Sequence, residues 1–444
     1  MAADQQGLKL TGAPRSAEAF DRAVADYFGL TGDPVGILKQ ALAEDPNFIL
    51  GSVGVAGLFM IGGFRGDCPE VVNALRAATA AADGATDRER LHLSAVAAWA
   101  EGRSWDAILA WERILADWPQ DALALRFGQD AYFFLGQANA LRDSVARVLP
   151  SWERDNPLRS FILGAYAFGL EETGELQRAE DAARAALEAN PRDAWATHAL
   201  AHVFETACRQ DEGIAFLKRT HADWGQAHFM AGHNGWHLAL FLIEEGRFGE
   251  VLAGYDAFAT PKLADDMTLD RVDAASLLWR LELAGVDVGD RWTPLARAWM
   301  AHVDDHVLAF DDLHCALAAA RSPDAGDVTR FRHSLEAYDR EGVGYNRQVT
   351  AEVGRRLIEG ALAFAAGDYE RAVEEIVPVR YEAARIGGSH AQRDIINQTL
   401  IAAAERSGKW RLARALLAER LALRPTARTK AAYEAALAHA LAAS

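Results

Sequence analysis

The chain has 444 residues, of which 50% are hydrophobic and 25% charged, and its formal net charge is −17. This composition excludes a disordered chain, and the length suits two or three domains or one extended repeat array. The negative charge argues against binding to nucleic acid, which needs a basic surface, and against adsorption to anionic membranes.

The N-terminal segment, residues 1–16, lacks the basic stretch and apolar core of a secretory signal. We expect it to be a flexible lead-in. The three cysteines, Cys68, Cys208 and Cys315, are far apart and lack CxxC spacing, which suits a reducing compartment. The sequence therefore predicts a cytoplasmic protein.

Residues 17–86 form a predicted N-terminal helical segment. Its longest apolar run, from Phe48 to Phe64, is interrupted by several glycines and is short for a membrane span. We expect instead a buried helix that packs closely through Gly51, Gly54 and Gly57.

Residues 87–261 form a predicted central region with an internal repeat. Glycines recur there at intervals of 34, 38, 36 and 36 residues, if Gln210 is counted where a glycine would fall. Each position lies between two helical stretches, where a residue with positive φ typically ends the first helix. The five positions are Gly102, Gly136, Gly174, Gln210 and Gly246.

Small residues and prolines follow these glycines at fixed distances. Alanine occurs five positions after Gly102 and Gly174, and proline closes both units seventeen positions after the glycine. Such spacing is typical of the tetratricopeptide repeat (TPR), in which a small residue lets two helices approach and proline stops the second. The matching residues are Ala107, Pro119, Ala179 and Pro191, with Gly367, Ala372, Gly408, Ala413 and Pro425 near the C-terminus.

Residues 262–444 are predicted to continue the helical repeats, and strand patterns are scarce throughout. The fold class expected is all-α, a superhelical array of TPR-like helix pairs that can curl around an internal cavity. The alanine-rich last helix, Ala427–Ala443, would cap the array or support a homodimer.

Three HxxxH pairs mark the candidate functional region. Residues four apart lie on one face of a helix, so each pair would present two imidazoles side by side. The first pair, His198 and His202, also has Glu205 on its face, and the second is His233 and His237. The third is His302 and His306, followed by Asp312 and His314.

These side chains have three interpretations that the sequence leaves open. An HxxxH helix with a carboxylate can supply ligands to a divalent metal, although the HExxH pattern of zinc proteases is absent. Neutral imidazoles in a pocket can act as general acids and bases without a metal. Alternatively, they form a polar, hydrogen-bonded layer within the core.

Several phrases of the sequence resemble one family. They include HALAHVFE (198–205), GHNGWHLALFLIEEGRF (232–248), VDAASLLWRLELAGVDVGDRW (272–292) and FDDLHCALAAA (310–320). They are similar to the tetratricopeptide repeat protein 38 family, in the same order over nearly the whole chain. The resemblance implies an all-α, intracellular repeat fold, and it supplies no reaction and no catalytic residue.

We predict that the paired histidines line one internal pocket that binds and transforms a small organic molecule by acid–base, elimination or hydrolytic chemistry. In it, Glu205 would raise the pKa of a facing imidazole. The alternative function is a scaffold that binds a protein or peptide partner in a concave groove. The predicted catalytic residues are His198, His202, Glu205, His233, His237, His302, His306, Asp312 and His314, and the predicted substrate-binding residues are Trp195, Asn234 and Trp236.

Overall fold

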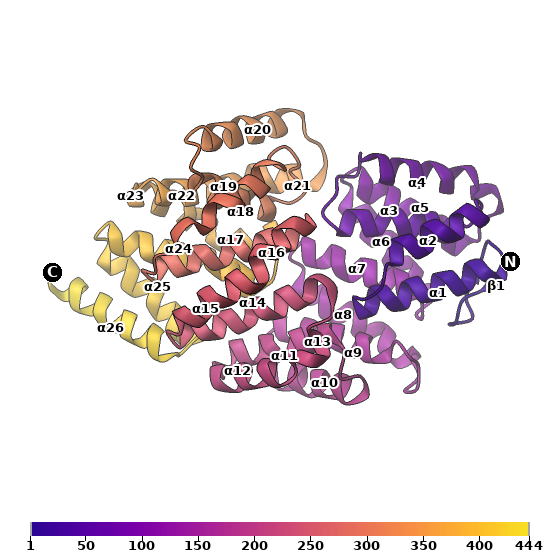
Figure 1. The fold of residues 1–444 in the computed structure, drawn as a ribbon, viewed down its shortest axis with the longest axis horizontal. Coiled ribbons are helices and arrows are strands. Elements are labelled where there is room, and N and C mark those ends of the chain that lie inside the picture. Colours follow the sequence, from indigo (N-terminus) through magenta and orange to yellow (C-terminus); the bar gives the residue numbers. More distant parts are fainter. Residues whose placement is uncertain (1, 443–444) are drawn as a thin grey trace. The chain divides into compact units, whose positions relative to one another are not determined.

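The computed structural model describes residues 2–442. These residues are helical nearly throughout (Figure 1), which confirms the predicted all-α class. Residue 1 of the predicted lead-in and residues 443–444 of the predicted last helix lie outside the described range.

Contacts divide the chain into two compact units. The division falls inside helix α11 rather than at residue 261, where we expect the central region to end. The first unit takes the described residues within Met1–Ala199, Gln226–Met230 and Val343–Asn346, and the second takes those within Leu200–Gly225, Ala231–Gly342 and Arg347–Ser444.

The first unit begins with a small antiparallel sheet and continues as helical hairpins, among which α3 packs on α4, α5 on α6 and α9 on α10. Its elements are β1 (Ala2–Ala3), β2 (Lys9–Leu10), α1 (Pro14–Gly29), α2 (Pro34–Glu44), α3 (Ile49–Ile61), α4 (Pro69–Ala80), α5 (Asp87–Ala100), α6 (Ser104–Asp117), α7 (Ala122–Phe134), α8 (Ala138–Val148), α9 (Arg159–Glu172), α10 (Leu176–Ala189) and the start of α11 (Ala194–Thr206).

The N-terminal segment is held against α5, so our expectation of a flexible lead-in is wrong. Leu10 is 0% exposed, and Arg88 forms a buried ion pair with Asp4 at 3.3 Å. The hydroxyl of Thr11 donates to Glu89 at 2.8 Å. The composition of the segment did not indicate these partners, which lie about eighty residues downstream.

The glycine-rich apolar run forms the buried helix α3, as predicted. A Cβ atom added at Gly57 would lie 2.4 Å from the ring of Phe127 on α7. A Cβ atom added at Gly51 would lie 2.4 Å from Phe48, and one added at Gly54 would lie 2.7 Å from Leu38. Among the described residues, no helix has the length and hydropathy needed to cross a membrane.

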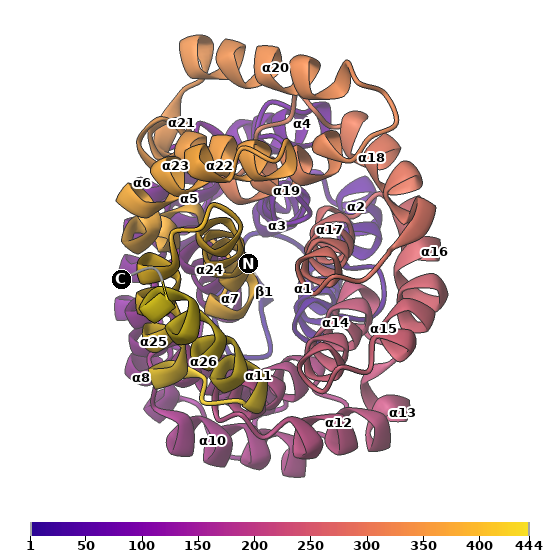
Figure 2. The same ribbon diagram turned by 90° about the vertical axis from the view of Figure 1, so that its left-hand side faces the viewer.

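The second unit continues the helical pairs, with α22 on α23 and α25 on α26 (Figure 2). Its elements are the end of α11, α12 (Gln210–Arg219), α13 (His221–Trp224), the part of α14 (His228–Glu244) after Met230, α15 (Phe248–Gly254), α16 (Thr260–Lys262), α17 (Thr268–Leu283), α18 (Trp292–Met300), α19 (Ala309–Ala320), α20 (Asp327–Glu341), the end of α21 (Gly344–Val349), α22 (Arg355–Ala365), α23 (Tyr369–Ile376), α24 (His390–Arg406), α25 (Trp410–Leu423) and α26 (Ala427–Ala442).

The repeat spacing identifies the turns within both units, with one correction. Gly102 and Gly174 have φ angles of 75° and 80°, and the other predicted turn glycines are also in the left-handed region. At the position assigned to Gln210, the left-handed residue is Cys208, with a φ of 56°. Gln210 instead begins α12. A non-glycine residue such as Cys208 can adopt the left-handed conformation at some energetic cost.

The small residues and prolines of the repeat also have their predicted roles. Ala107 and Ala179 are 0% exposed, as are Ala372 and Ala413 in the second unit. Helices α6, α10 and α25 end two residues before Pro119, Pro191 and Pro425, respectively. The fold is therefore an all-α array of TPR-like helix pairs.

Candidate functional site

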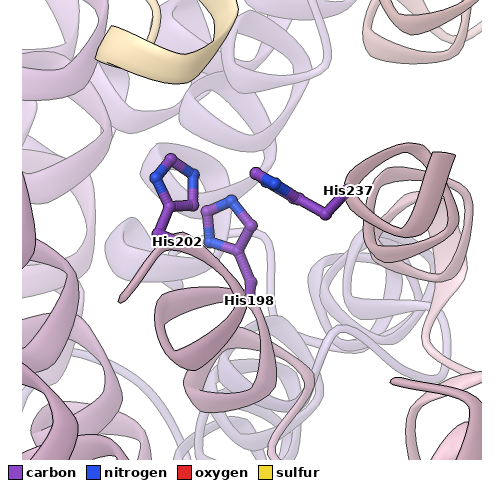
Figure 3. A group of neighbouring side chains, drawn as sticks. All are labelled: His198, His202 and His237. Carbon is purple, nitrogen blue, oxygen red and sulfur yellow. The ribbon is translucent and has the colours of Figure 1, made fainter. Parts of the chain in front are cut away.

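Two imidazoles of the predicted set face each other within the second unit. The ring centroids of His202 on α11 and His237 on α14 are 4.5 Å apart, and both side chains are 0% exposed. His198 lies one turn before His202 on α11, and a nitrogen of His198 lies within 4.8 Å of one of His202 (Figure 3). The HxxxH spacing thus places both imidazoles of α11 on one face of that helix.

Glu205 connects this histidine pair to Arg424, a half-buried arginine. Nδ1 of His237 donates to one carboxylate oxygen of Glu205 at 3.2 Å, and Arg424 donates to the other oxygen at 2.7 Å. Burial raises the pKa of Glu205, but Arg424 and the hydrogen bond from His237 outweigh it, so the pKa lies well below its usual value. Glu205 is therefore ionised, and His237 is held with its proton on Nδ1.

The charge state of His237 is the opposite of the one we expect from its carboxylate partner. Burial and the neighbouring His202 lower the pKa of His237 to about 3, although Glu205 acts in the other direction. The free-energy cost of taking an imidazolium out of water exceeds the stabilisation from one carboxylate, which is also shared with Arg424. A neutral imidazole of this kind is a poor general base near neutral pH, and it is the form that ligates metals.

A second histidine–carboxylate pair lies beside the first. His233 Nδ1 is 2.7 Å from Asp273 on α17, and its ring stacks on Trp236 with centroids 5.2 Å apart. The centroid of His233 is also 5.0 Å from that of His237. Asn234, on the same helix, is 0% exposed. The second HxxxH pair is therefore part of one polar cluster in the second unit.

The third HxxxH pair is not on a helix, so the shared face that we predict for His302 and His306 does not exist. Residues 301–308 form turns and irregular backbone before α19, and His306 has a left-handed φ of 46°. His302 is near the surface, with Asp266 and Asp305 each at 2.7 Å. A helical pattern alone could not reveal this irregular segment.

The remaining predicted residues have local partners. His306 bonds to Asp312 at 2.9 Å and stacks on Tyr338, while Nδ1 of His314 donates to the carbonyl of Phe310 at 2.8 Å, one turn earlier. Burial lowers the pKa of His314 to about 4, so this ring is neutral. These contacts match the structural interpretation of the histidines.

Trp195 belongs to the first unit. Its indole lies 5.1 Å from the ring of His198 and 5.5 Å from that of Phe168, between centroids. The guanidinium of Arg126 lies over the same indole at 4.6 Å. In these contacts Trp195 packs against aromatic and cationic side chains of its own unit.

A pocket of about 160 Å³ opens next to Glu205 inside the second unit, between helices α11, α14, α17, α24, α25 and α26. Phe241, Ile401 and Leu417 contribute apolar surface to it. Its ionisable lining consists of Glu205, Glu244, Arg280, Asp394, Glu405, Arg420, Arg424 and Arg428.

Several of the charged groups in the lining form ion pairs with one another. Arg420 donates to Asp394 at 2.6 Å, in parallel with the pair between Arg424 and Glu205. Burial raises the pKa of Asp394, but Arg420 and Arg424 outweigh it and leave the pKa well below its usual value. The pocket wall is thus built from ionised, mutually oriented groups.

Sequence reasoning missed the residues that α17, α24 and α25 contribute. Asp273 and Arg280 are within the phrase 272–292 and are seven residues apart, which places them on one helical face. That spacing could have identified both as candidate residues of the site. Arg424 is 219 residues from Glu205, and no local pattern could have paired them.

The histidines of this cluster include donors of the kind that bind a divalent metal. His202 and His237 offer imidazoles from two helices of the second unit, and burial keeps that of His237 neutral. Glu205 orients His237 through Nδ1, which is how carboxylates support histidine ligands in metal sites. These two histidines would leave the remaining tetrahedral positions for other donors, a substrate or water.

Comparison with known proteins gives no family for the chain. No protein-family model matches it. One solved structure that is similar, a human IFIT1 dimer with m7Gppp-AAAA, aligns at a TM-score of 0.42 and 14% identity, covering 97% of this chain and 96% of that chain. The fold assignment rests on the helices of this chain itself.

Proposed function

We propose that this chain is a TPR-like binding protein whose second unit holds a small organic molecule in the pocket beside Glu205. The observation that carries the proposal is the pocket itself, in which apolar surface and several oriented ionic groups converge. Such a combination is typical of small-molecule sites. We keep the resemblance to the tetratricopeptide repeat protein 38 family as part of this proposal.

General acid–base catalysis by the histidines receives less support than binding. The low pKa of His237 and the ionised state of Glu205 leave neither group with a pKa near neutrality, as proton transfer at that pH would require. The proposed primary activity is therefore recognition of the ligand.

Metal-assisted hydrolysis is the second candidate, favoured by the facing imidazoles of His202 and His237, whose ring centroids lie 4.5 Å apart. A bound divalent ion could activate a water molecule without a side chain of suitable pKa. Elemental analysis of the purified protein tests this candidate. A stoichiometric metal that is lost in a His202→Ala variant would support it, and a metal-free protein that gains no stability from added Zn²⁺ or Mn²⁺ would exclude it.

The binding proposal is tested by filling the pocket. Ala402 on α24 lines it, and Ala402→Phe would occupy its volume without changing any charge. Native mass spectrometry of the purified chain, together with a thermal-shift screen of small metabolites, should detect ligands for the natural protein and none for the variant. Ala418→Phe, at an exposed position of α25, is the matched control and should bind as the natural protein does.

A peptide scaffold, the alternative function, gives a different result in the same experiment. Peptide binding would survive Ala402→Phe if the partner uses another surface, and small metabolites would not shift the melting temperature of either protein. That outcome would replace the small-molecule proposal by the scaffold.

We further propose a cytoplasmic protein that binds neither nucleic acid nor membranes, in line with its net charge of −17 and its three free cysteines. The proposal also includes a homodimer through α26. Ala436 and Ala440 of this helix are buried within the chain, while Leu441 is 66% exposed. Light scattering at several concentrations distinguishes a dimer from a monomer.

A further inference from the structure

Arg280 is the most deeply buried cation in the wall of the pocket. It lies on α17, is 2% exposed and lines the cavity beside Glu205. The guanidinium lies over the indole of Trp236 at 5.3 Å from the ring centroid. Its position is therefore fixed by packing before any ligand arrives.

The partners of Arg280 are neutral. Its Nη2 donates to the carbonyls of Ala391 and Gln392 at 2.8 and 3.2 Å, and its Nη1 donates to Ser276. Within the part of the chain that the structure describes, it forms no ion pair with a carboxylate, and none of its hydrogen bonds uses Nε. A buried charge without a counter-ion is costly.

Burial has a visible effect on this group. It lowers the pKa of Arg280 to about 10, even though Asp394 and Glu205 act in the opposite direction from beyond contact distance. These two carboxylates are themselves bound by Arg420 and Arg424. They are therefore not available as counter-ions for Arg280.

A second arginine of the lining also has no carboxylate partner among the described residues. Arg428, on α26, is exposed and donates to the carbonyl of Ile243 at 3.0 Å. Because it lines the pocket while remaining exposed, it lies towards the mouth. Arg280 and Arg428 thus provide two positive groups, one deep and one shallow, in the same cavity.

The carboxylates of the lining limit the charge of a ligand. Besides Glu205 and Asp394, the wall contains Glu244, which accepts a hydrogen bond from the hydroxyl of Thr426, and Glu405. Burial raises the pKa of Glu405. Four carboxyl groups would repel a polyanion such as a nucleic-acid strand, whereas one anionic group can be placed at the guanidinium.

We propose that the pocket recognises a small organic molecule through a single anionic group, a carboxylate or a phosphate monoester, which Arg280 binds and Arg428 attracts at the entrance. The inference rests on the proposed small-molecule function and names its ligand class. Guanidinium groups suit both anions because their paired N–H groups match two oxygens.

The test uses ligand-observed NMR on the full chain with three probes of similar shape: benzoate, phenyl phosphate and the neutral benzamide. We expect at least one anion to bind about tenfold more tightly than benzamide, which is the loss of one charge-assisted contact. Tighter binding of benzoate would identify a carboxylate ligand, and tighter binding of phenyl phosphate would identify a phosphate ligand.

Variants locate the binding. Arg280→Met should weaken binding of the anions about tenfold and leave binding of benzamide unchanged. Arg280→Lys, which keeps the charge, should weaken anion binding less. Arg428→Ala should reduce anion affinity more at low salt than at high salt. Arg414→Ala, at an exposed position of α25, is the control and should change nothing.

Two failures are distinguishable. If benzamide binds as tightly as both anions, or if Arg280→Lys and Arg280→Met leave anion binding intact, the anionic class is wrong while a small-molecule pocket stands. If none of the probes binds and the metabolite screen also finds no ligand, the proposed function itself falls.

Discussion

At the scale of single residues, the second unit is organised around the carboxylate of Glu205. One oxygen accepts from His237 and the other from Arg424, so helices α11, α14 and the end of α25 meet at one charged group. The same carboxylate faces the pocket. The ionic contact that joins these helices is therefore also part of the pocket wall.

Removing the cation from this contact should be costly. In Arg424→Met the carboxylate of Glu205, with a side chain 8% exposed, would lose its counter-ion. We expect the free energy of unfolding to fall by about 3 kcal/mol, as when other buried ion pairs lose one partner. Urea denaturation checks this value, with Arg414→Ala, which should stay within about 0.5 kcal/mol of the natural protein, as control. A similar small effect in both variants would contradict the account.

The pH dependence of stability should report His237. An unfolded histidine has a pKa near 6.5, and the folded value is about 3, so below pH 6.5 the unfolded chain binds a proton that the folded chain does not. Stability is therefore lost as the pH falls, by about 2 kcal/mol between pH 6.5 and 5 from this group.

The variant His237→Gln separates this contribution from the others, since its side-chain amide can still donate to Glu205. Its unfolding free energy should change less between pH 6.5 and 5 than that of the natural protein, by about 2 kcal/mol. Glu205, with its lowered pKa, contributes stability that is lost only below its ordinary value of 4.5, outside this window. Equal slopes for both proteins would show that His237 titrates normally.

At the scale of elements, the sequence predicted what depends on local spacing. Turn glycines, buried alanines and terminating prolines each follow from the backbone needs of one helix pair, and they appear where expected. The predicted Gln210 turn failed because Cys208 adopts the left-handed conformation instead. The partners of Glu205 and Arg88 could not be predicted, because tertiary packing alone brings them together.

Helix α3 provides a test of close packing in the first unit. Gly57→Ala would place a Cβ atom 2.4 Å from Phe127, and we expect a loss of about 1–3 kcal/mol from overpacking. Gly128→Ala on α7 meets nothing within 4 Å and should instead stabilise by about 0.5–1 kcal/mol through helix propensity. Thermal denaturation of both variants checks the opposite signs, and the same sign in both would contradict the packing described.

The N-terminal sheet gives a second test at this scale. Leu10 in β2 is 0% exposed, so Leu10→Ala should destabilise the first unit by about 2–4 kcal/mol. The comparison is Leu109→Ala on α6, where the side chain is 66% exposed and the cost should be below about 1 kcal/mol. A neutral Leu10→Ala would restore the flexible lead-in that the sequence suggested.

At the scale of the whole molecule, the repeats provide rigid helix pairs, and the chemistry is concentrated in the second unit. Several helices of this unit contribute polar residues, and stacking collects them in one place. Residues 205, 280 and 424 come from three separate pairs yet line a single pocket. The fold alone does not specify a ligand, so the account depends on this pocket being a binding site.

Crystallographic fragment screening of the full chain tests that claim most directly. The account predicts that bound fragments appear in the pocket beside Glu205, that those with a carboxylate or phosphate place it at Arg280, and that Ala402→Phe crystals show none there. Fragments found only elsewhere on the protein, with the pocket empty in every data set of the natural chain, would contradict it.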